Sequence, residues 1–280
     1  MAVDRNVYVV GLPESGKTTY LAALWHLLNA TSNSLCLNLH RLSGNRSYLN
    51  TIVERWRECL PVDRTPRNTH EKMTIELKTV ESCQILSLNI PDLSGESFIE
   101  AFGSRSLQTL DEEAIHSCTG LLVFVSTNRP IRGSLIESLG PEFTDSEDSG
   151  PYESATIPWS PENAQEQVCL VDFLQSSRLT ADEYCKLRVA IVISAWDLVI
   201  DQDIQPHKWL QRELPLLSQF LRNGRNSFEF EIFGVSAQGA PFDENLSDDF
   251  LEKNPNERAV VQHKEKLSND LSSPLAWLVE

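Results

Sequence analysis

A run of eight residues near the start of the chain has the composition and spacing of a phosphate-binding loop. Residues 11–18 read GLPESGKT, which fits the pattern G-x-x-x-x-G-K-[ST]. The glycines let successive backbone N–H groups turn inward around phosphate oxygens, Lys17 reaches the β- and γ-phosphates, and the Thr18 hydroxyl coordinates Mg²⁺. The chemistry that these residues predict is the binding of a nucleoside triphosphate with its magnesium ion.

The residues on either side of this loop predict the strand and the helix that such a phosphate site needs. Residues 6–10, NVYVV, form a short β-rich run that ends at Gly11, and residues 17–29 repeat apolar side chains at the spacing of a helix. The N-terminus of that helix adds its positive end to the site. A glycine turn before an amphipathic helix is the alternative interpretation.

A second motif, NIPDLSGES at residues 89–97, places an acid at the end of an apolar strand and a glycine three residues later. In a phosphate-binding fold such an acid, here Asp92, binds the Mg²⁺ ion through water, and the N–H of Gly95 can meet the γ-phosphate. A bare D-x-x-G often marks only a turn. Its position after a strand and downstream of a phosphate-binding loop favours the functional interpretation.

Strands and helices alternate along the rest of the chain. Residues 72–80 and 83–93, which are separated by a short polar turn, predict a hairpin. Three later runs predict further strands, at residues 120–127, 188–197 and 228–237. The first two are continuous apolar runs, as in strands that are buried on both faces. This alternation predicts a mostly parallel sheet that helices cover on both sides.

Other segments predict elements around this sheet. A strand at 34–42 and a helix at 45–60 form an insertion before the hairpin. One later helix is predicted from the spacing of Leu210, Leu214, Leu217 and Leu221. Another is predicted from Val168, Val171 and Leu174. A last short helix can begin at Pro274 with Ser273 as its cap.

The composition limits the classes of protein to which the chain can belong. It has 280 residues, of which 41% are hydrophobic, so it can bury a full core, and we expect one domain over 1–280 with insertions at about 31–62 and 128–163. A net charge of −16 argues against a nucleic-acid surface. The six cysteines lack C-x-x-C or C-x-x-H spacing and suit buried reduced thiols. No apolar run reaches the roughly 18 residues of a membrane span, so we expect a cytoplasmic protein that binds no membrane.

Four motifs, GLPESGKTT, DLSGE, SAWD and GVSA, occur in this order and resemble the nucleotide-binding motifs of translation-factor-related and Ras-like GTPases. The string SGKTTYLAALW and the terminal PLAWLV are also similar to the bacterial double-GTPase proteins, which occur in multi-gene conflict systems beside a second GTPase and an associated partner protein. The resemblance implies a P-loop NTPase (Ras-like) three-layer α/β sandwich. Its sheet would be mostly parallel, with one antiparallel edge strand.

The resemblance also implies how the base would be recognised. SAWD corresponds to N-K-x-D, in which the aspartate, here Asp197, accepts hydrogen bonds from guanine N1–H and the 2-amino group. Ser194 and Ala195 depart from that pattern, so binding should be weaker or less specific. In GVSA a backbone N–H near Ala237 would meet guanine O6. The residues expected to bind the nucleotide are Gly11, Glu14, Ser15, Gly16, Lys17, Thr18, Thr19, Gly95, Asp197, Ser236 and Ala237. Trp196, at the free position of the motif, is expected to pack in the core rather than to stack on the base.

The expected catalytic residues are Lys17, Glu96 and Thr65. Glu96 occupies the position where Ras-like proteins have the glutamine that orients the attacking water, and a solvated surface glutamate is the alternative. The switch threonine that completes the Mg²⁺ shell would be Thr65, with Thr69 as the alternative, so the metal ligands would be Thr18, Asp92 and Thr65. Arg64 and Arg67 are candidate arginine fingers, although solvated loop arginines are the simpler interpretation.

These residues lead to a GTP-binding switch that uses Mg²⁺, hydrolyses GTP and acts with protein partners, such as a second GTPase or an associated regulator of a bacterial conflict or defence system. Two alternatives stay open. One is a nucleotide-binding interaction module with little or no turnover. The other is an ATP-dependent P-loop kinase or ATPase, for which Arg129 and Arg132 in the segment 128–163 could belong to a lid.

Overall fold

The strands of the protein form a single mixed sheet. The computed structural model describes residues 5–30, 35–61, 73–91, 95–107, 112–128, 160–180, 186–225, 227–240 and 248–280. Within them the strands are β1 (Arg5–Val10), β2 (Leu37–Ser43), β3 (Met73–Thr79), β4 (Ile85–Ile90), β5 (Gly120–Ser126), β6 (Leu187–Ser194), β7 (Phe228–Ser236), β8 (Val260–His263) and β9 (Lys266–Ser268). Their order in the sheet is β2-β3-β4-β1-β5-β6-β7-β8-β9.

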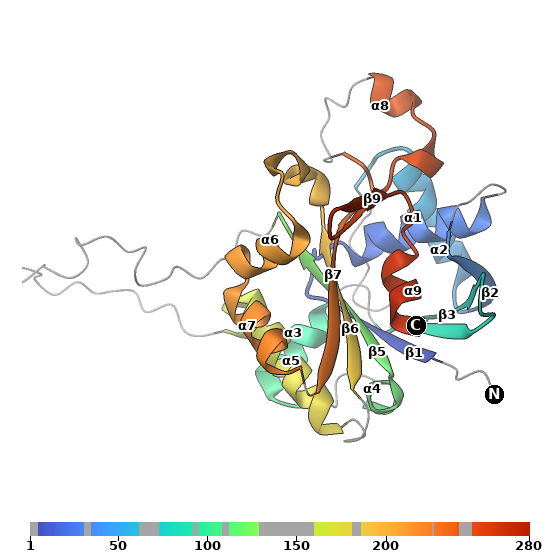
Figure 1. Ribbon diagram of the computed structural model, residues 1–280. Helices are drawn as coiled ribbons and strands as arrows, with labels where there is room; N and C mark the ends of the chain where they lie inside the picture. Colours follow the sequence, from blue (N-terminus) through green and yellow to red (C-terminus); the bar gives the residue numbers. More distant parts are fainter. Residues whose placement is uncertain are drawn as a thin grey trace, which may run out of the picture.

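Helices lie on both faces of this sheet (Figure 1). They are α1 (Lys17–Asn29), α2 (Arg46–Arg57), α3 (Glu96–Ser104), α4 (Glu112–Ser117), α5 (Glu166–Thr180), α6 (Pro206–Glu213), α7 (Pro215–Asn223), α8 (Asp248–Glu252) and α9 (Ser273–Val279). Short 3-10 turns are η4 (Pro161–Asn163), η5 (Trp196–Leu198), η6 (Ile200–Gln202) and η7 (Pro255–Glu257). No helix among the described residues is long and apolar enough to cross a membrane.

The five central strands β4, β1, β5, β6 and β7 are parallel to one another, which confirms the mostly parallel α/β sheet that the sequence predicts. The antiparallel part is larger than the single edge strand that we expected. The hairpin of β3 and β4 is antiparallel, but β2 pairs outside β3 and becomes the edge. At the other edge, β8 and β9 add a second antiparallel hairpin to β7. Short turns join β3 to β4 and β8 to β9, whereas the connection from β2 to β3 runs through α2. Parallel neighbours need a crossover.

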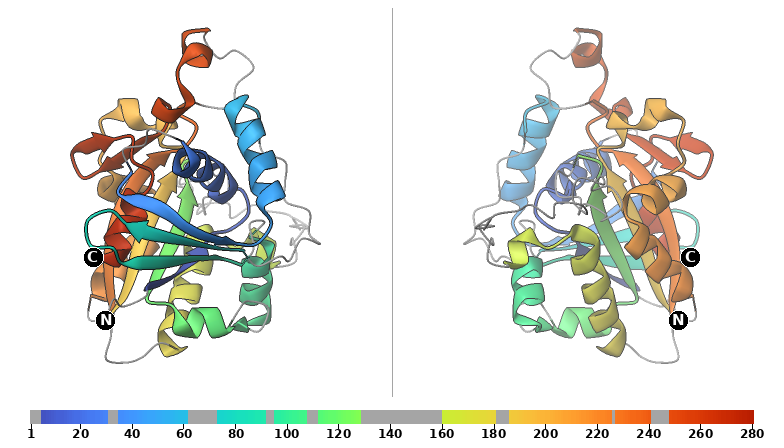
Figure 2. Two further views of the ribbon diagram at one scale, coloured as in Figure 1. Left: turned by 90° about the vertical axis from the view of Figure 1, so that its right-hand side faces the viewer. Right: turned by 90° about the vertical axis from the view of Figure 1, so that its left-hand side faces the viewer.

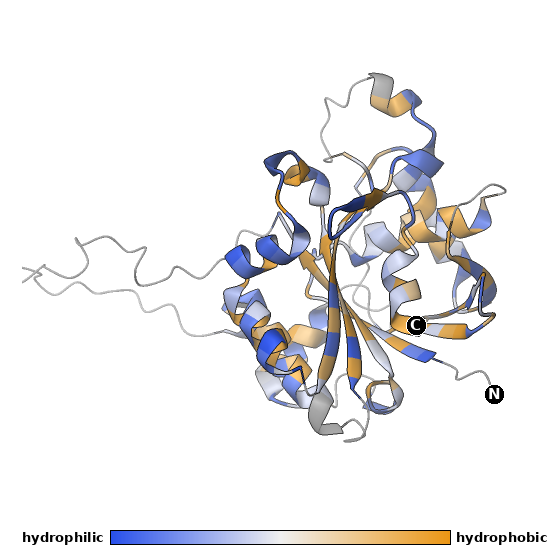
Figure 3. Ribbon diagram, viewed as in Figure 1, coloured by the Kyte–Doolittle hydropathy of each residue, from blue (hydrophilic) through white to orange (hydrophobic). Residues whose placement is uncertain are grey.

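The central strands are buried on both faces, and alternate residues serve two separate cores. Figure 3 shows the hydropathy of each residue along these strands and helices. In β1, Val7 and Val9 pack with α1, α2 and α9, whereas Tyr8 and Val10 pack with the helices of the opposite face, which include α3, α5, α6 and α7. The two views of Figure 2 look at these two helical layers from opposite sides. The continuous apolar runs in the sequence are thus explained, because a strand between two helical layers has no solvated face.

Three expectations about helices need correction. The leucines from 210 to 221 are divided between α6 and α7, with Leu214 at the junction, because Pro215 has no N–H to continue α6 and instead starts α7. In α5, Leu174 is buried as predicted, but Val168 is 37% exposed, and the buried face contains Leu170 in its place. The last helix begins at Ser273, with Ser272 at the N-cap position, and the Ser273 hydroxyl donates to Asp270 O at 2.8 Å rather than capping α9.

Gly234 in β7 lies directly beneath the indole of Trp196, which is fully buried. A Cβ atom at residue 234 would come within 2.4 Å of Trp196 Cδ2. We therefore expect Gly234→Ala to lower the free energy of unfolding by about 1–3 kcal/mol, because neither the strand nor the ring has room to move. Urea unfolding measures this change. Gly120→Ala in β5 is the matched control, since its Cβ would meet at 3.1 Å only the tip of the Leu278 side chain; an equal loss in both variants would contradict the prediction.

Candidate functional site

The phosphate-binding loop joins β1 to α1 at the carboxyl end of the parallel strands. Gly16 is the N-cap of α1 and has a φ of 89°, a left-handed conformation that favours glycine. Lys17, the first residue of α1, is only 3% exposed. Its Nζ donates to Gly11 O at 2.7 Å and to Leu12 O at 2.9 Å. The ammonium therefore lies inside the loop, where it can exchange these carbonyl partners for phosphate oxygens.

The second sequence motif meets this loop at Gly95. This residue is the N-cap of α3 with a φ of 77°. A Cβ on it would be 2.6 Å from Gly11 O and 2.7 Å from both the Leu12 carbonyl carbon and Lys17 Nζ. Only glycine fits so close to the loop, and the N-terminus of α3 is thus brought beside the Lys17 ammonium. Glu96 follows as the first residue of α3 and is half-buried.

Several predicted residues lie outside the described residues. They are Arg64, Thr65, Arg67, Thr69, Asp92, Arg129 and Arg132. Of the expected Mg²⁺ ligands the structure therefore places only Thr18, which is half-buried in the first turn of α1. A hydroxyl at the second position of this helix is an oxygen donor of the type that Mg²⁺ prefers. The described part of the metal site fits the ion, and the roles of Asp92 and Thr65 stay predictions.

Asp197 lies in the turn η5 that follows β6 and is held by Ser236, the last residue of β7. The hydroxyl of Ser236 donates a short hydrogen bond to Asp197 Oδ1 and accepts the N–H of Gly239 at 2.9 Å. Because β6 and β7 are parallel neighbours, the residues that follow them come together at the same edge of the sheet. Ser236, which the sequence predicted to contact the nucleotide, is 1% exposed. Its hydroxyl instead positions the Asp197 carboxylate.

Ser194, which departs from the expected asparagine, connects the end of β6 to the phosphate-binding loop. Its hydroxyl donates to Ser15 O at 2.8 Å, and a Cβ on Gly16 would lie 2.7 Å from the Ser194 side chain. The next residue, Ala195, is left-handed with a φ of 52°, and its carbonyl accepts from Thr127 Oγ1 at 2.7 Å. The hydroxyl of Ser194 thus links the end of β6 directly to the phosphate-binding loop.

Trp196 turns away from the site, as the sequence analysis expected. It is fully buried, its Nε1 donates to Gln262 Oε1 at 2.7 Å, and its ring packs edge-on against Trp209 with centroids 6.3 Å apart. The indole is therefore part of the core beside Asp197 and offers no face to a base.

A cavity of about 290 Å³ lies between the loop and Asp197, at the carboxyl ends of β5, β6 and β7. This is the edge of a parallel sheet where ligands bind in open α/β folds, and the volume is near the lower end of the roughly 300–1,000 Å³ of small-molecule sites. The predicted residues that line it are Glu14, Gly16, Thr19, Asp197 and Ala237. Apolar side chains, among them Phe124, Val192 and Val235, also line the cavity, as the flat faces of a base require.

Tyr20 forms part of this wall and stays uncharged. Burial, with a smaller contribution from the carboxylate of Asp270, raises the pKa of Tyr20 far above its ordinary value. Its hydroxyl donates to Leu271 O at 2.6 Å, and its ring meets Phe124 edge-to-face with centroids 5.2 Å apart. The wall is therefore fixed by packing and by a hydrogen bond to the C-terminal segment.

A family model described as Double-GTPase 1 matches residues 8–278 of the chain. The chain belongs to the double-GTPase 1 family. This membership confirms the resemblance seen in the sequence, and the protein is a P-loop GTPase of that class with an α/β fold. No match to a curated protein was found.

Three solved structures match the chain at low identity and low TM-score. The crystal structure of Sup35 complexed with GDP is 13% identical with a TM-score of 0.36, over 85% of this chain and 38% of that one. The bacterial selenocysteine-specific elongation factor EF-Sec is 14% identical with a TM-score of 0.33, over 82% and 25%. The S. cerevisiae Ski7 GTPase-like domain bound to GTP is 15% identical with a TM-score of 0.38, over 89% and 45%. The double-GTPase thus spans less than half the length of each of these chains.

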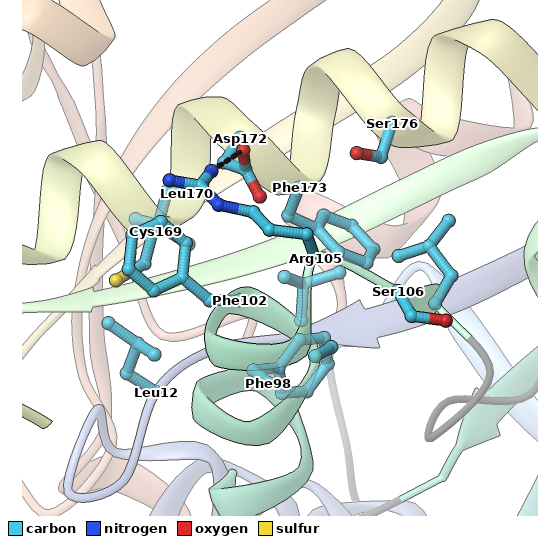
Figure 4. Close-up of a pocket in the computed structure, with 13 residues that line it drawn as sticks. Leu12, Phe98, Phe102, Arg105, Ser106, Cys169, Leu170, Asp172, Phe173 and Ser176 are labelled. Carbon is cyan, nitrogen blue, oxygen red and sulfur yellow. Dashed lines mark hydrogen bonds and ion pairs between the residues drawn. The ribbon is translucent and has the colours of Figure 1, made fainter. Parts of the chain in front are cut away.

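A second, smaller cavity of the double-GTPase lies between α3 and α5 (Figure 4). Its volume is about 90 Å³, which is room for about three water molecules and too little for a nucleotide. Arg105 reaches over Phe102, with its guanidinium carbon 4.8 Å from the ring centroid, and pairs with Asp172 of α5 at 2.6 Å. Helix α3 is therefore attached at one end to the phosphate-binding loop, through Gly95, and at the other end to α5.

Some residues of the double-GTPase site are not found by the sequence motifs. Phe124 and Val192 line the cavity from the middle of apolar strands, where nothing distinguishes them from ordinary core residues. Gln238, which follows GVSA directly, also lines the cavity. Its place next to a predicted base-contacting residue is a signal that could have drawn attention to it.

Proposed function

We propose that this double-GTPase is a nucleotide switch that binds GTP with Mg²⁺ and hydrolyses it. One observation supports this most strongly. The structure brings Lys17 and Gly95, from two separate motifs, to the same phosphate-binding loop, and Asp197 lies across the cavity that this loop borders. A triphosphate along the loop would place its base toward the carboxylate.

Each part of the site has a role in this proposal. Lys17 binds the β- and γ-phosphates, and the backbone N–H of Gly95 meets the γ-phosphate. Thr18 would hold the Mg²⁺ ion, together with Asp92 and Thr65. The ion would neutralise charge on the phosphate oxygens. Loss of the γ-phosphate would release the segments near 61–70 and 93–105, which is the order-to-disorder change of nucleotide switches.

Guanine is the base that the polar groups support. The carboxylate of Asp197 only accepts hydrogen bonds, and guanine offers N1–H and a 2-amino group side by side. A backbone N–H near Ala237 would donate to guanine O6. The bond from Ser236 to Asp197 Oδ1 fixes the carboxylate before the base arrives, which lowers the entropic cost of ordering it on binding.

Glu96 and Thr65 are the proposed catalytic partners of Lys17. Glu96 begins α3 directly after Gly95, so it lies at the end of the loop where the γ-phosphate would be. From there a carboxylate can orient or polarise the attacking water. Arg64 and Arg67 stay candidate arginine fingers, because they flank the proposed switch threonine in the sequence.

Phosphate release from GTP tests the proposed hydrolysis. The wild-type chain is expected to release phosphate over multiple turnovers with Mg²⁺ and to stop when the ion is chelated. Thr18→Ala is expected to lower the Mg²⁺-dependent rate by about 10-fold or more, since one ligand of the ion is lost. Thr51→Ala on the exposed side of α2 is the matched control and should leave the rate unchanged. Equal rates in wild type and Thr18→Ala would contradict the proposed metal site.

A second candidate function is an interaction module that binds GTP and hardly turns it over. The observation that favours it is Glu96, whose negative charge would be repelled by the γ-phosphate beside it. Such a module would be recognised by a partner through its bound nucleotide. GTP binding without phosphate release, even after long incubation, would support it. For either function the proposed partners are a second GTPase or an associated regulator, in a bacterial conflict system.

A further inference from the structure

Helix α2 holds the loop that follows β7 through a pair of opposite hydrogen bonds. The Nε1 of Trp56, at the C-terminal end of α2, donates to Ala237 O at 3.1 Å. In return, Nε2 of Gln238 donates to Trp56 O at 3.4 Å. Trp56 is fully buried and its ring lies 5.1 Å from that of His26, whose pKa is lowered chiefly by burial. The neutral ring of His26 and the packed indole of Trp56 therefore fix the position of the loop that follows β7.

These contacts decide which way the amide of Gln238 points. The partner at Trp56 is a backbone carbonyl, which can only accept, so the group of Gln238 that faces it must be the NH₂. The other amide atom, Oε1, is buried and has no hydrogen-bond partner within the part of the chain that the structure describes. The side chain as a whole is 4% exposed.

A buried oxygen without a partner is unfavourable, because its hydration is lost and nothing replaces it, at about 1–3 kcal/mol. Native proteins hold few such atoms, and each one that remains calls for an explanation, such as a functional role or a bound water or ion. Gln238 lines the 290 Å³ cavity together with Asp197 and Ala237. Its hydrogen bond to Trp56 is long at 3.4 Å and therefore weak, so it offers little resistance to a reorientation of the amide toward a molecule in the cavity.

We propose that Gln238 is a specificity-determining residue of the nucleotide site, and that its Oε1 accepts a hydrogen bond from the nucleoside part of the bound nucleotide. This inference rests on the proposed function, since it needs a nucleotide in the cavity. The donor on the ligand is either the 2-amino group of the base or a hydroxyl of the ribose. The motifs for the phosphates and for the base carboxylate do not include this residue.

The test compares ligands that lack one donor each. Dissociation constants are measured for GTP, for inosine triphosphate, which lacks the 2-amino group, and for 2′-deoxy- and 3′-deoxy-GTP. Each is measured with the wild-type chain and with Gln238→Met, which keeps the length of the side chain and removes the acceptor. Gln175→Met, on the exposed surface of α5, is the matched control. If Gln238→Met does not fold, Gln238→Leu takes its place.

Gln238→Met is expected to weaken GTP binding about 10-fold, while Gln175→Met leaves it unchanged. The loss should disappear for one of the analogues, because that analogue lacks the donor that Oε1 accepts from. Disappearance with inosine triphosphate identifies the base amine, and disappearance with a deoxy analogue identifies a ribose hydroxyl. An equal loss for all four ligands, or no loss for any, would overturn the proposal. Failure of the wild-type chain to bind GTP at all would instead overturn the proposed function.

Discussion

Lys17→Ala is expected to lower the affinity for GTP by about 100-fold or more. The reason is that its ammonium would make charge-assisted hydrogen bonds to phosphate oxygens, each contributing about 1.5–3 kcal/mol. In the structure the same ammonium is buried and its described partners are oxygens of the loop itself, at 2.7 Å from Gly11 O and 2.9 Å from Leu12 O. It is thus already in place for the ligand. Equilibrium titration with labelled GTP measures the loss.

A stability check separates lost binding from lost folding. Removing Lys17 leaves the carbonyls of Gly11 and Leu12 without this donor, so the variant should unfold at a somewhat lower urea concentration. Binding is therefore measured under conditions where the variant is folded. Lys186→Ala, which removes an exposed lysine outside the cavity, is the matched control. Full GTP affinity in folded Lys17→Ala would contradict the assigned role of the loop.

Asp197→Asn is expected to weaken GTP binding by about 10- to 100-fold, because an amide NH₂ would face the guanine 2-amino group and leave both donors unpaired, at about 1–3 kcal/mol. Ser236 donates to Oδ1 of Asp197, so the oxygen of the new amide would keep this bond and its NH₂ would point at the base. Xanthosine triphosphate has a carbonyl where guanine has the amine. Its affinity is therefore expected to rise in the variant.

Competition between GTP and xanthosine triphosphate for the same labelled nucleotide measures this change. Asp201→Asn is the matched control, since Asp201 is exposed in the neighbouring turn η6 and does not line the cavity. The control should keep the wild-type preference for GTP. A parallel loss of affinity for both nucleotides in Asp197→Asn, with no change in preference, would show that Asp197 does not contact the base.

The sequence predicts the central part of the fold because the signals there are local. Apolar runs long enough to cross a buried strand define β5 and β6, and the spacing of glycine, lysine and threonine defines the loop before α1. Predictions that depended on one face of a helix were weaker. In α5 both Val168 and Leu170 fit a helical spacing, and only packing against α3 and α7 decides that Leu170 is buried.

For the site, as for the fold, local sequence signals could be interpreted and long-range contacts could not. Residues within a motif, such as Lys17, Gly95 and Asp197, can be predicted as site residues because their chemistry and order are visible in the chain. Gln238 was not found, because the contact that orients it comes from Trp56, 182 positions away. The role of Ser194 was also missed for this reason, since its partner Ser15 is 179 positions away. Contacts of this kind depend on how the sheet brings strand ends together.

The comparison of GTP and ATP binding to the wild-type chain with Mg²⁺ tests the account most directly. The triphosphates are identical in the two ligands, so any difference in affinity comes from the base, which the account places against Asp197 and Ala237. GTP is expected to bind at least about 10-fold more tightly, since adenine cannot offer two donors to one carboxylate. A tenfold preference for ATP would contradict the guanine assignment, and no binding of either nucleotide would contradict the account as a whole.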